Sequence, residues 1–430
     1  MKQVKCDVTV IGSGVGGITV AALLAKAGYK TLVVEKLPFA GGRCATLDHH
    51  GFRINTGAAM IGEEIHGVLC REVGAELELR VPENVFIFRV NGKDYPAPHK
   101  GVLKTIIGKA ARDDAEAERV YKAFLRSVTW SEPSYSMSLD DWARQYTENP
   151  SLLRIFQFFT TAVGMNSYEM PAGEFFRSMT EGAVITWAYP PLGGGQFSDA
   201  MVGAIKRMGG DVWTRCPAVQ VKVKNGAAAG VVVQKDGKEI EILAQAVISN
   251  TPPWRTVEMV GREHLGPGYL KDVGKITGAP MICFHMTSDR QLLEGSSVLG
   301  LTESLRLYNI LDYTPMCPEM SPKGKHLLEA ITVPTSVFPP YDIKKEVAMT
   351  LQDLRNVIPD FDNQVQILRI NIARGDWGVT GNIPGRGTLP TRTPVYGLYS
   401  VGDRSAPPGW WCSLAAIKSG RLVAEDVMKR

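Results

Sequence analysis

The chain has 430 residues, of which 44% are hydrophobic and 21% are charged, and its formal net charge is +4. A single hydrophobic core stops growing near about 250–300 residues, so this length predicts two domains. The charge is small and spread along the chain, which excludes an electrostatic case for nucleic-acid binding.

Cysteine usage and hydropathy indicate the cellular compartment in which the protein is expected. The seven cysteines are scattered and include no C-x-x-C pair, a pattern that favours a reducing compartment over a disulfide framework. No apolar run reaches the roughly 18 residues that a membrane-spanning helix needs. We therefore expect a cytoplasmic protein, and both peripheral membrane contact and the oligomeric state stay open.

The first elements predict a dinucleotide-binding unit at residues 8–35. A short apolar strand is followed by Gly12, Gly14 and Gly17, whose G-x-G-x-x-G spacing opens a helix of small residues. The first glycine permits a tight turn, the second lets a pyrophosphate approach the backbone, and the third lets the helix pack against the strand. The helix N-terminus offers free N–H groups to the phosphates. A second strand ends at Glu35, about 20 residues beyond the second glycine, where an acid that binds the adenosine ribose is expected.

A glycine pair and a second glycine-bounded segment follow this unit. Glu35-Lys36 leads to Gly41-Gly42-Arg43, and residues 51–57 read Gly-Phe-Arg-Ile-Asn-Thr-Gly. This continuation resembles the family of phytoene desaturases, protoporphyrinogen oxidases and flavin amine oxidases. The resemblance implies FAD, bound non-covalently because no attachment residue is marked, with the glycine pair and the arginine clamping the flavin side of the pyrophosphate. It assigns cofactor contacts here to Lys36, Gly42, Arg43, Asn55, Thr56 and Gly57, although the family usually has Asp in place of the asparagine.

The next region begins with a hairpin around the Asn91-Gly92 turn and then becomes helical through residue 186. Ser138 predicts a helix start, with an acid three residues later. The helix around residues 152–163 is strongly apolar, which predicts a buried core helix. The wall of an apolar substrate tunnel and a membrane-facing surface are the alternatives for this helix.

The chain then returns toward the cofactor. Residues 191–195 are similar to the family's Pro-x-Gly-Gly segment, and a helix that Gly209 ends leads to a strand at 218–223. By resemblance, the backbone of Val219 would hydrogen-bond the adenine, and a plain amphipathic strand is the alternative. The following strands, ending with residues 240–248, are expected to complete a β-meander.

Residues 265–388 mix strands with loops. A strand is expected at 281–285 and an amphipathic helix at 343–357. This region contains no nucleophile–base set and no metal-ligand spacing, so His285 is expected to face the core or to be hydrogen-bonded. The pair His49-His50 has no third ligand nearby and is expected on a loop.

The C-terminal segment carries the last block of the resemblance. A strand runs into Gly402-Asp403, and Trp410-Trp411-Cys412 lead into a final helix at Ser413-Leu414. In the family, the acid of this turn binds the ribityl chain and the helix N-terminus faces the flavin C2 carbonyl. A helix N-terminus stabilises the negative charge that reduced flavin carries there. The resemblance therefore implies cofactor contacts from Gly402, Asp403, Ser413 and Leu414.

These blocks predict an α/β protein in which a Rossmann-like FAD-binding domain is interleaved with a mixed α+β substrate domain. The FAD-binding domain is expected to comprise residues 1–75, 187–265 and 390–430. The substrate domain is expected to comprise residues 76–186 and 266–389.

The predicted function is that of an FAD-dependent dehydrogenase or desaturase. It would remove a hydride and a proton from a largely apolar, cyclic or polyene substrate by transfer to flavin N5, because the flavin itself carries this chemistry. No second G-x-G-x-x-G occurs, so we expect the electron acceptor to be O2, a quinone or another protein. The sequence identifies no catalytic base, and the candidate cavity residues are Trp410, Trp411 and Cys412.

Two other functions stay open. A flavin amine oxidase that releases hydrogen peroxide would carry paired aromatic residues beside the flavin, one near the start of the last helix. This chain has Cys412 there, preceded by Trp411, so the aromatic pair is not evident and the desaturase is favoured. A non-enzymatic prenyl- or lipid-binding protein of the dissociation-inhibitor type shares the architecture without FAD, but Glu35 and Gly402-Asp403 argue against it.

Overall fold

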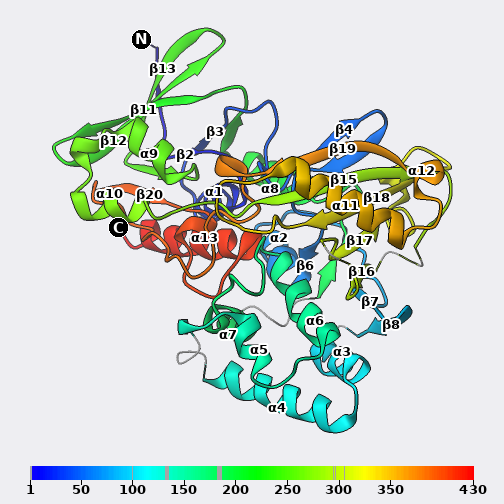
Figure 1. The fold of residues 1–430 in the computed structure, drawn as a ribbon. Coiled ribbons are helices and arrows are strands. Elements are labelled where there is room, and N and C mark those ends of the chain that lie inside the picture. The colour runs from blue at the N-terminus through cyan, green and yellow to red at the C-terminus, as the bar shows by residue number, and fades with distance from the viewer. Residues whose placement is uncertain are drawn as a thin grey trace.

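The computed structural model describes residues 2–98, 100–130, 135–181, 186–293, 295, 297–304 and 306–430. Figure 1 shows strands from the N-terminal, middle and C-terminal parts of the chain gathered on one side. A second large sheet lies on the other side, and a layer of helices lies beneath it. The chain therefore crosses between the two sheets more than once, as the interleaved fold class predicts.

A five-stranded parallel sheet contains the predicted dinucleotide unit. Its strand order is β10-β3-β2-β14-β20, so segments far apart in the sequence are hydrogen-bonded neighbours. Parallel strands are buried on both faces, which explains the continuous β-branched runs that predicted them. The strands are β2 (Val8–Ile11), β3 (Thr31–Val34), β10 (Asp211–Trp213), β14 (Ala246–Ser249) and β20 (Leu398–Ser400).

The two faces of this sheet have different coverings. On one face, Val10 and Val33 pack against helices. On the other face, Ile11 and Val34 pack against a four-stranded sheet. The helices are α1 (Val15–Lys26), α8 (Gly195–Arg207) and α13 (Cys412–Met428), and the covering strands are β1 (Lys2–Lys5), β11 (Ala218–Lys224), β12 (Ala227–Lys235) and β13 (Lys238–Leu243).

The prediction of a single strand over residues 240–248 is wrong. Lys238–Leu243 form β13 of the four-stranded sheet, whereas Ala246–Ser249 form β14 of the parallel sheet. The backbone N–H of Gln245 donates to Asp7 O at 3.1 Å, which turns the chain from one sheet to the other. Hydrophobic periodicity does not reveal such a switch, because each segment is apolar enough to read as a strand.

A seven-stranded sheet lies on the other side of the molecule, with the order β19-β15-β18-β17-β16-β7-β8. Its residues alternate between two faces. The face that carries Phe284 and Leu328 packs on α11 (Ile343–Val357), so the helix expected there is confirmed. The face that carries Cys283 and Glu329 lines a cavity. The strands are β7 (Phe86–Val90), β8 (Lys93–Ala97), β15 (Met281–Ser288), β16 (Val298–Leu301), β17 (Asn309–Asp312), β18 (His326–Thr332) and β19 (Gln366–Ala373).

The layer of helices lies at the bottom of Figure 1. Ser138 caps one of them by accepting from the backbone N–H of Asp141, as predicted. In the apolar helix α6, Phe156 is fully buried in the core, whereas Phe158 and Phe159 at its end line the cavity. The core prediction is therefore confirmed for Phe156, and Phe158, which belongs to the same core cluster, also lines the cavity with Phe159. The helices are α3 (Val102–Ala110), α4 (Asp114–Thr129), α5 (Leu139–Arg144), α6 (Pro150–Thr161) and α7 (Ala172–Glu181).

Short elements connect these layers. The loop expected for His49-His50 is only partly correct, because His49 ends a strand and His50 alone lies in the turn, with φ +51°. The short strands pair as β4 (Thr46–His49) with β5 (Phe52–Asn55), and β6 (Ile61–Gly62) with β9 (Trp187–Ala188). The remaining α-helices are α2 (Val68–Glu72), α9 (Pro253–Val260), α10 (Pro267–Val273) and α12 (Phe361–Gln364).

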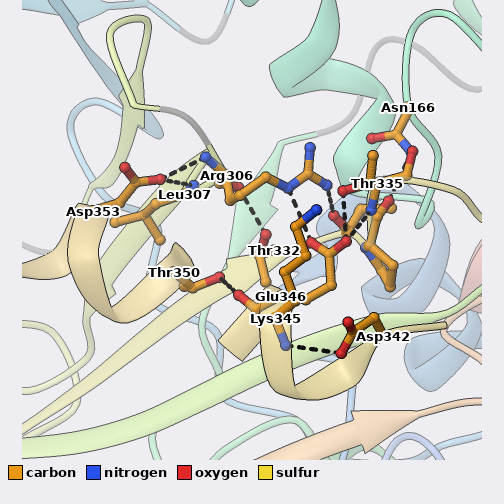
Figure 2. A network of polar contacts seen from close by, with 12 residues as sticks. Asn166, Arg306, Leu307, Thr332, Thr335, Asp342, Lys345, Glu346, Thr350 and Asp353 are labelled. Carbon is orange, nitrogen blue, oxygen red and sulfur yellow. Dashed lines mark hydrogen bonds and ion pairs between the residues drawn. The ribbon is translucent and has the colours of Figure 1, made fainter. Parts of the chain in front are cut away.

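A buried polar network fixes α11 to the seven-stranded sheet (Figure 2). The guanidinium of Arg306 lies 3.2 Å from Glu346 Oε2, and the two side chains are 7% and 5% exposed. Thr335 donates its backbone N–H to Glu346 Oε1 at 2.8 Å. Asp353 accepts from the backbone N–H of Leu307 at 2.9 Å. The loops at the end of the sheet are thereby tied to one face of the helix.

All seven cysteines are free thiols. Within the described ranges, no helix combines the length and the apolar character that crossing a bilayer demands.

Candidate cofactor and substrate site

One cavity of about 1500 Å³ lies between the parallel sheet, the seven-stranded sheet and the layer of helices. At the parallel sheet it opens where the strands end, which is the usual ligand position in such sheets. Of the residues predicted to contact cofactor or substrate, all but Gly17 line this cavity. They are Gly12, Gly14, Glu35, Lys36, Gly42, Arg43, Asn55, Thr56, Gly57, Val219, Gly402, Asp403, Trp410, Trp411, Cys412, Ser413 and Leu414.

The glycines after β2 form a backbone cradle. A Cβ on Gly14 would lie 2.5 Å from the side-chain amide of Asn250, so a larger residue would displace that amide. A Cβ on Gly17 would lie 2.2 Å from Gly12 O, so this glycine lets α1 pack directly on the turn. Gly12 itself has φ +93°, a conformation that favours glycine. The N-terminus of α1 carries no side-chain cap, and its N–H groups are therefore available to an anion.

Glu35 is held at the end of β3 and is 5% exposed. Its Oε2 accepts from the backbone N–H and from the hydroxyl of Ser13, each at 2.8 Å, and its Oε1 accepts from Leu37 N at 2.9 Å. A carboxylate has about four lone-pair positions, so each oxygen can accept a further hydrogen bond from a ribose hydroxyl.

Arg43 and Asp403 form one paired unit. The guanidinium donates to both carboxylate oxygens, at 2.8 and 2.9 Å, and also to Gly378 O and Val379 O at 3.0 Å. Burial alone would raise the pKa of Asp403, but the charge and hydrogen bonds of Arg43 hold that pKa below its ordinary value. The resemblance implies a separate cofactor contact for each of these residues. In the structure, the two residues also form an ion pair with each other at the cavity wall.

Asn55 and Thr56 organise the backbone around this pair. Asn55 Oδ1 accepts from Gly194 N and from the hydroxyl of Thr46, each at 2.9 Å. The hydroxyl of Thr56 donates to Gly42 O at 2.9 Å. The asparagine that replaces the family's usual Asp therefore accepts hydrogen bonds from two uncharged donors. This role does not require a negatively charged side chain.

Val219 lies at an irregularity of β11. The strand register passes from Ala218 opposite Val233 to Gln220 opposite Val232, so Val219 has no partner in β12. A bulged residue leaves its backbone groups outside the ladder. Because Val219 also lines the cavity, its N–H and C=O are suitably placed for a base such as adenine.

The segment before α13 borders the middle of the cavity. Trp410 and Trp411 both line it, and the indole of Trp411 lies 3.4 Å from Glu174 Oε1. Cys412 has φ +51°, a left-handed conformation that is uncommon for a residue other than glycine. Burial raises the pKa of the Cys412 thiol to about 12, so the sulfur stays protonated at neutral pH.

His66 is a neighbour of this segment that sequence reasoning missed. Its Nε2 lies 3.0 Å from Ser413 Oγ, and its Nδ1 lies 3.2 Å from the backbone of Gly62. Burial lowers the pKa of His66 to about 4, so the imidazole is neutral at pH 7. The ring therefore orients the first hydroxyl of α13. Nothing in the local sequence pattern signals this contact, because the two residues come from opposite ends of the chain.

The other end of the cavity is mainly apolar. Phe158 and Phe159 face one face of the seven-stranded sheet, which contributes Cys283, Glu329 and Asn371 among others. His285, expected in the core or hydrogen-bonded, is confirmed as buried, and its Nε2 lies 3.0 Å from Asn371 Nδ2. In the part of the chain that the structure describes, no group of three His, Cys, Asp or Glu side chains is arranged to hold a metal ion.

Comparison with known proteins decides the family. The sequence model of the flavin-containing amine oxidoreductases matches residues 15–428. The chain belongs to this family. This match confirms the resemblance drawn from the cofactor motifs. The comparisons also confirm the fold class, FAD as the cofactor, and an FAD-dependent oxidoreductase as the enzyme class.

Individual relatives cover different shares of the chain. An uncharacterized protein of Methanocaldococcus jannaschii is 26% identical over 92% of this chain and 92% of its own. The phytoene desaturase of Cercospora nicotianae is 27% identical over 66% of this chain, which spans 51% of that desaturase. The crystal structure of an oxidoreductase from Methanosarcina mazei is 25% identical and covers 99% of this chain and all of its own, with a TM-score of 0.85.

The residues present fit FAD. The glycine cradle that a Cβ would fill, the free N–H groups of α1 and the fixed carboxylate of Glu35 form one end of the site. The Arg43–Asp403 pair and the N-terminus of α13 line the same cavity. These groups suit a molecule with a ribose, a pyrophosphate and a reducible ring system that accumulates negative charge.

Proposed function

We propose that the protein is a dehydrogenase or desaturase that removes a hydride and a proton from a largely apolar, cyclic or polyene substrate. FAD supplies the redox chemistry when bound, accepting the hydride at its N5 atom. The observation that carries the proposal is the continuity of the cavity, whose cofactor end and apolar end are one space. The similarity to the phytoene desaturase of Cercospora nicotianae supports the choice of an apolar substrate.

The protein's own part is to bind, to orient and to exclude water. The backbone of Gly12 and Gly14 would receive the pyrophosphate, and Glu35 would accept the ribose hydroxyls. Phe158 and Phe159 line the apolar end of the cavity, and the tryptophans before α13 line it as well. An apolar wall of this kind favours a hydrocarbon skeleton and keeps bulk water away from the reacting carbon.

The cavity also reaches the layer of helices, where Val102, Leu103 and Leu125 line it. Leu125 is 47% exposed and therefore lies at the surface. We propose this mouth as the route by which an apolar substrate enters, either from solution or from a membrane surface. The electron acceptor is proposed to be O2, a quinone or another protein.

A second candidate is an amine oxidase that releases hydrogen peroxide. Trp410 and Trp411 both line the cavity, and aromatic residues beside a flavin suit an amine substrate. The enzyme class decides against the non-enzymatic lipid-binding alternative.

Anaerobic reduction of the bound flavin tests the proposal. The purified protein is mixed with polyenes, cyclic ketones and amines, and the loss of flavin absorbance is recorded. Bleaching by a polyene or a cyclic ketone supports the dehydrogenase. Bleaching by amines alone, with hydrogen peroxide formed on readmission of air, supports the amine oxidase. Failure of every compound to bleach the flavin would refute both.

A further inference from the structure

A buried carboxyl group interrupts the apolar wall of the cavity. Glu329 lies in the middle of β18, lines the cavity and is 3% exposed. Its Oε2 accepts from the hydroxyl of Tyr313 at 2.9 Å and lies 3.4 Å from His285 Nδ1. Among the described residues, no group donates a hydrogen bond to Oε1. One oxygen is thus fixed by the protein and the other is left for a ligand.

The contacts of His285 settle which of its nitrogens carries the proton. The amide Nδ2 of Asn371 can only donate, and it lies 3.0 Å from His285 Nε2. Nε2 must therefore accept, which leaves the proton on Nδ1, the nitrogen nearest Glu329. The phenol of Tyr313 donates to Oε2, and the protonated nitrogen of His285 lies 3.4 Å from the same oxygen.

Among the residues that the structure describes, no Lys or Arg forms an ion pair with this carboxyl group. The titratable groups that face it are Cys283 and His285 of β15, Tyr313 after β17 and Tyr189 after β9. Burial raises the pKa of Glu329 to about 7. Arg369 also lines the cavity, but it makes no ion pair with Glu329 within the described chain. Burying an acid without a charged partner is unfavourable, so stability alone does not account for this residue.

We propose that Glu329 is a binding site for a hydrogen-bond donor on the substrate, an alcohol O–H or an amine N–H on an otherwise apolar molecule. The proposal rests on the dehydrogenase function for its choice of an apolar skeleton, and it adds one polar group to that skeleton. An apolar wall holds the skeleton, and a single acceptor fixes its orientation. A molecule that lacks the donor leaves Oε1 buried without a partner.

The expected discrimination is large. Above pH 7 the carboxyl group is ionised, and a hydrogen bond to a charged group typically changes affinity by roughly 10- to 150-fold, so the binding tests are made at pH 8 or above. The site should therefore bind an alcohol or an amine at least about tenfold more tightly than the matching methyl ether, which cannot donate.

The preference for a hydrogen-bond donor can be tested with three retinoids. All-trans-retinol, retinylamine and retinyl methyl ether share one polyene skeleton and differ in the terminal group. Each is titrated into the FAD-loaded protein, and binding is read from the shift of the oxidised flavin spectrum. Tight binding of the alcohol alone assigns the site to hydroxyl substrates, and tight binding of the amine alone assigns it to amines. Equal affinity for all three, or binding of none, overturns the proposal.

Glu329→Gln provides the decisive variant. Because Tyr313 donates to Oε2, the amide oxygen should keep that position and the NH2 should replace Oε1. The site then changes from acceptor to donor, so the preference for alcohol or amine over ether should fall to about one or reverse. Unchanged discrimination in this variant refutes the assignment.

Glu346→Gln is the matched control, since it removes a buried carboxylate on the other side of the same sheet. This variant should unfold more readily and still discriminate among the three retinoids as the wild type does. If Glu329→Gln fails to fold, the wild-type comparison of alcohol with ether still decides the question. Flavin bleaching is recorded in the same titrations, so binding without reduction contradicts the proposed dehydrogenase while leaving the binding site intact.

Discussion

Glu346 and Glu329 are two buried carboxyl groups on opposite sides of the same sheet, and their surroundings differ. They are 4% and 3% exposed. Glu346 faces Arg306 at 3.2 Å through one oxygen and accepts from Thr335 N at 2.8 Å through the other. Within the described part of the chain, Glu329 has a hydrogen bond at one oxygen only and no Lys or Arg partner, and a cavity lies beside it.

The difference separates a structural role from a ligand-binding role. A buried charge whose two oxygens both accept hydrogen bonds from the chain contributes to holding elements together, as the network in Figure 2 does for α11. A buried acid that keeps one oxygen unused is unfavourable for stability unless something else binds it. Burial alone therefore does not identify a functional carboxylate, whereas an unused oxygen beside a cavity points to one.

Removing Arg306, the ion-pair partner of Glu346, should cause the largest loss of stability. Arg306→Leu leaves Glu346 buried without a cation, which typically costs about 3–5 kcal/mol of unfolding free energy. Urea denaturation at pH 5 measures this loss. Glu329→Gln is the matched comparison and should change stability by less than about 1 kcal/mol at that pH, because a protonated carboxyl and an amide are similar in size and charge. If Arg306→Leu changed the free energy of unfolding only slightly, the proposed difference between Glu346 and Glu329 would be wrong.

The pH dependence of stability should give the next largest effect. The pKa of Glu329 is about 7 in the folded protein and 4.5 for an ordinary Glu. Between these values the folded state holds a proton that the unfolded chain releases, so stability falls as the pH rises through about 7. The shift corresponds to about 3 kcal/mol. Glu329→Gln cannot titrate, so relative to the wild type it should gain about that amount between pH 5 and pH 8.

Urea midpoints at the two pH values, taken for both proteins, check this prediction. His66 and His285 titrate in the opposite sense, since burial lowers their pKa values. The contribution of His66 is common to wild type and variant and cancels in the difference. His285 lies beside Glu329, but its pKa of about 4 keeps it neutral in the folded protein across the pH range compared. Parallel pH curves for the two proteins would mean that Glu329 is not an uncompensated acid.

Glu35 sharpens the comparison, because it has both oxygens hydrogen-bonded and yet lines the cavity. If it also accepts the ribose hydroxyls, Glu35→Ala removes charge-assisted hydrogen bonds worth about 1.5–3 kcal/mol. FAD should then dissociate roughly 10- to 150-fold more readily. A flavin-release titration measures the change, and an unaltered dissociation constant would remove this residue from the cofactor site.

The smallest effect concerns a strained backbone position rather than a carboxylate. Cys412 adopts φ +51° where α13 begins beside the cavity. The left-handed conformation costs roughly 1 kcal/mol for a residue with a Cβ. Cys412→Gly should therefore raise the free energy of unfolding by up to about 1 kcal/mol without loss of FAD, as measured by denaturation of the holoprotein. A clear loss of stability would show that packing of the thiol outweighs the strain.

Local motifs made the cofactor end of the site predictable. Gly12, Gly14 and Glu35 lie within one strand–helix–strand unit, where spacing along the chain determines position in space. The Arg43–Asp403 ion pair was not predicted, although both residues were assigned to the site, because a motif assigns contacts to a ligand and not to another motif.

The substrate end was not predictable for a related reason. Glu329, His285 and Tyr313 belong to different strands or to the loop after one, and they meet only through the register of the seven-stranded sheet. Each reads as an ordinary residue in an alternating pattern. The error at residues 240–248 has the same origin, since the pairing partner of a strand is not encoded in its own hydrophobic period.

The position of β20 and α13 makes the first glycine loop depend on a distant part of the chain. Gly402, which follows β20, approaches the turn of this loop so closely that a Cβ on Gly16 would lie 2.8 Å from Gly402 N. The same amide donates to Ser419 Oγ in α13 at 2.9 Å. The cavity beside the loop is therefore complete only when β20 and α13 have folded against it. A ligand held between these segments should oppose local unfolding of α13, because it binds only the folded arrangement.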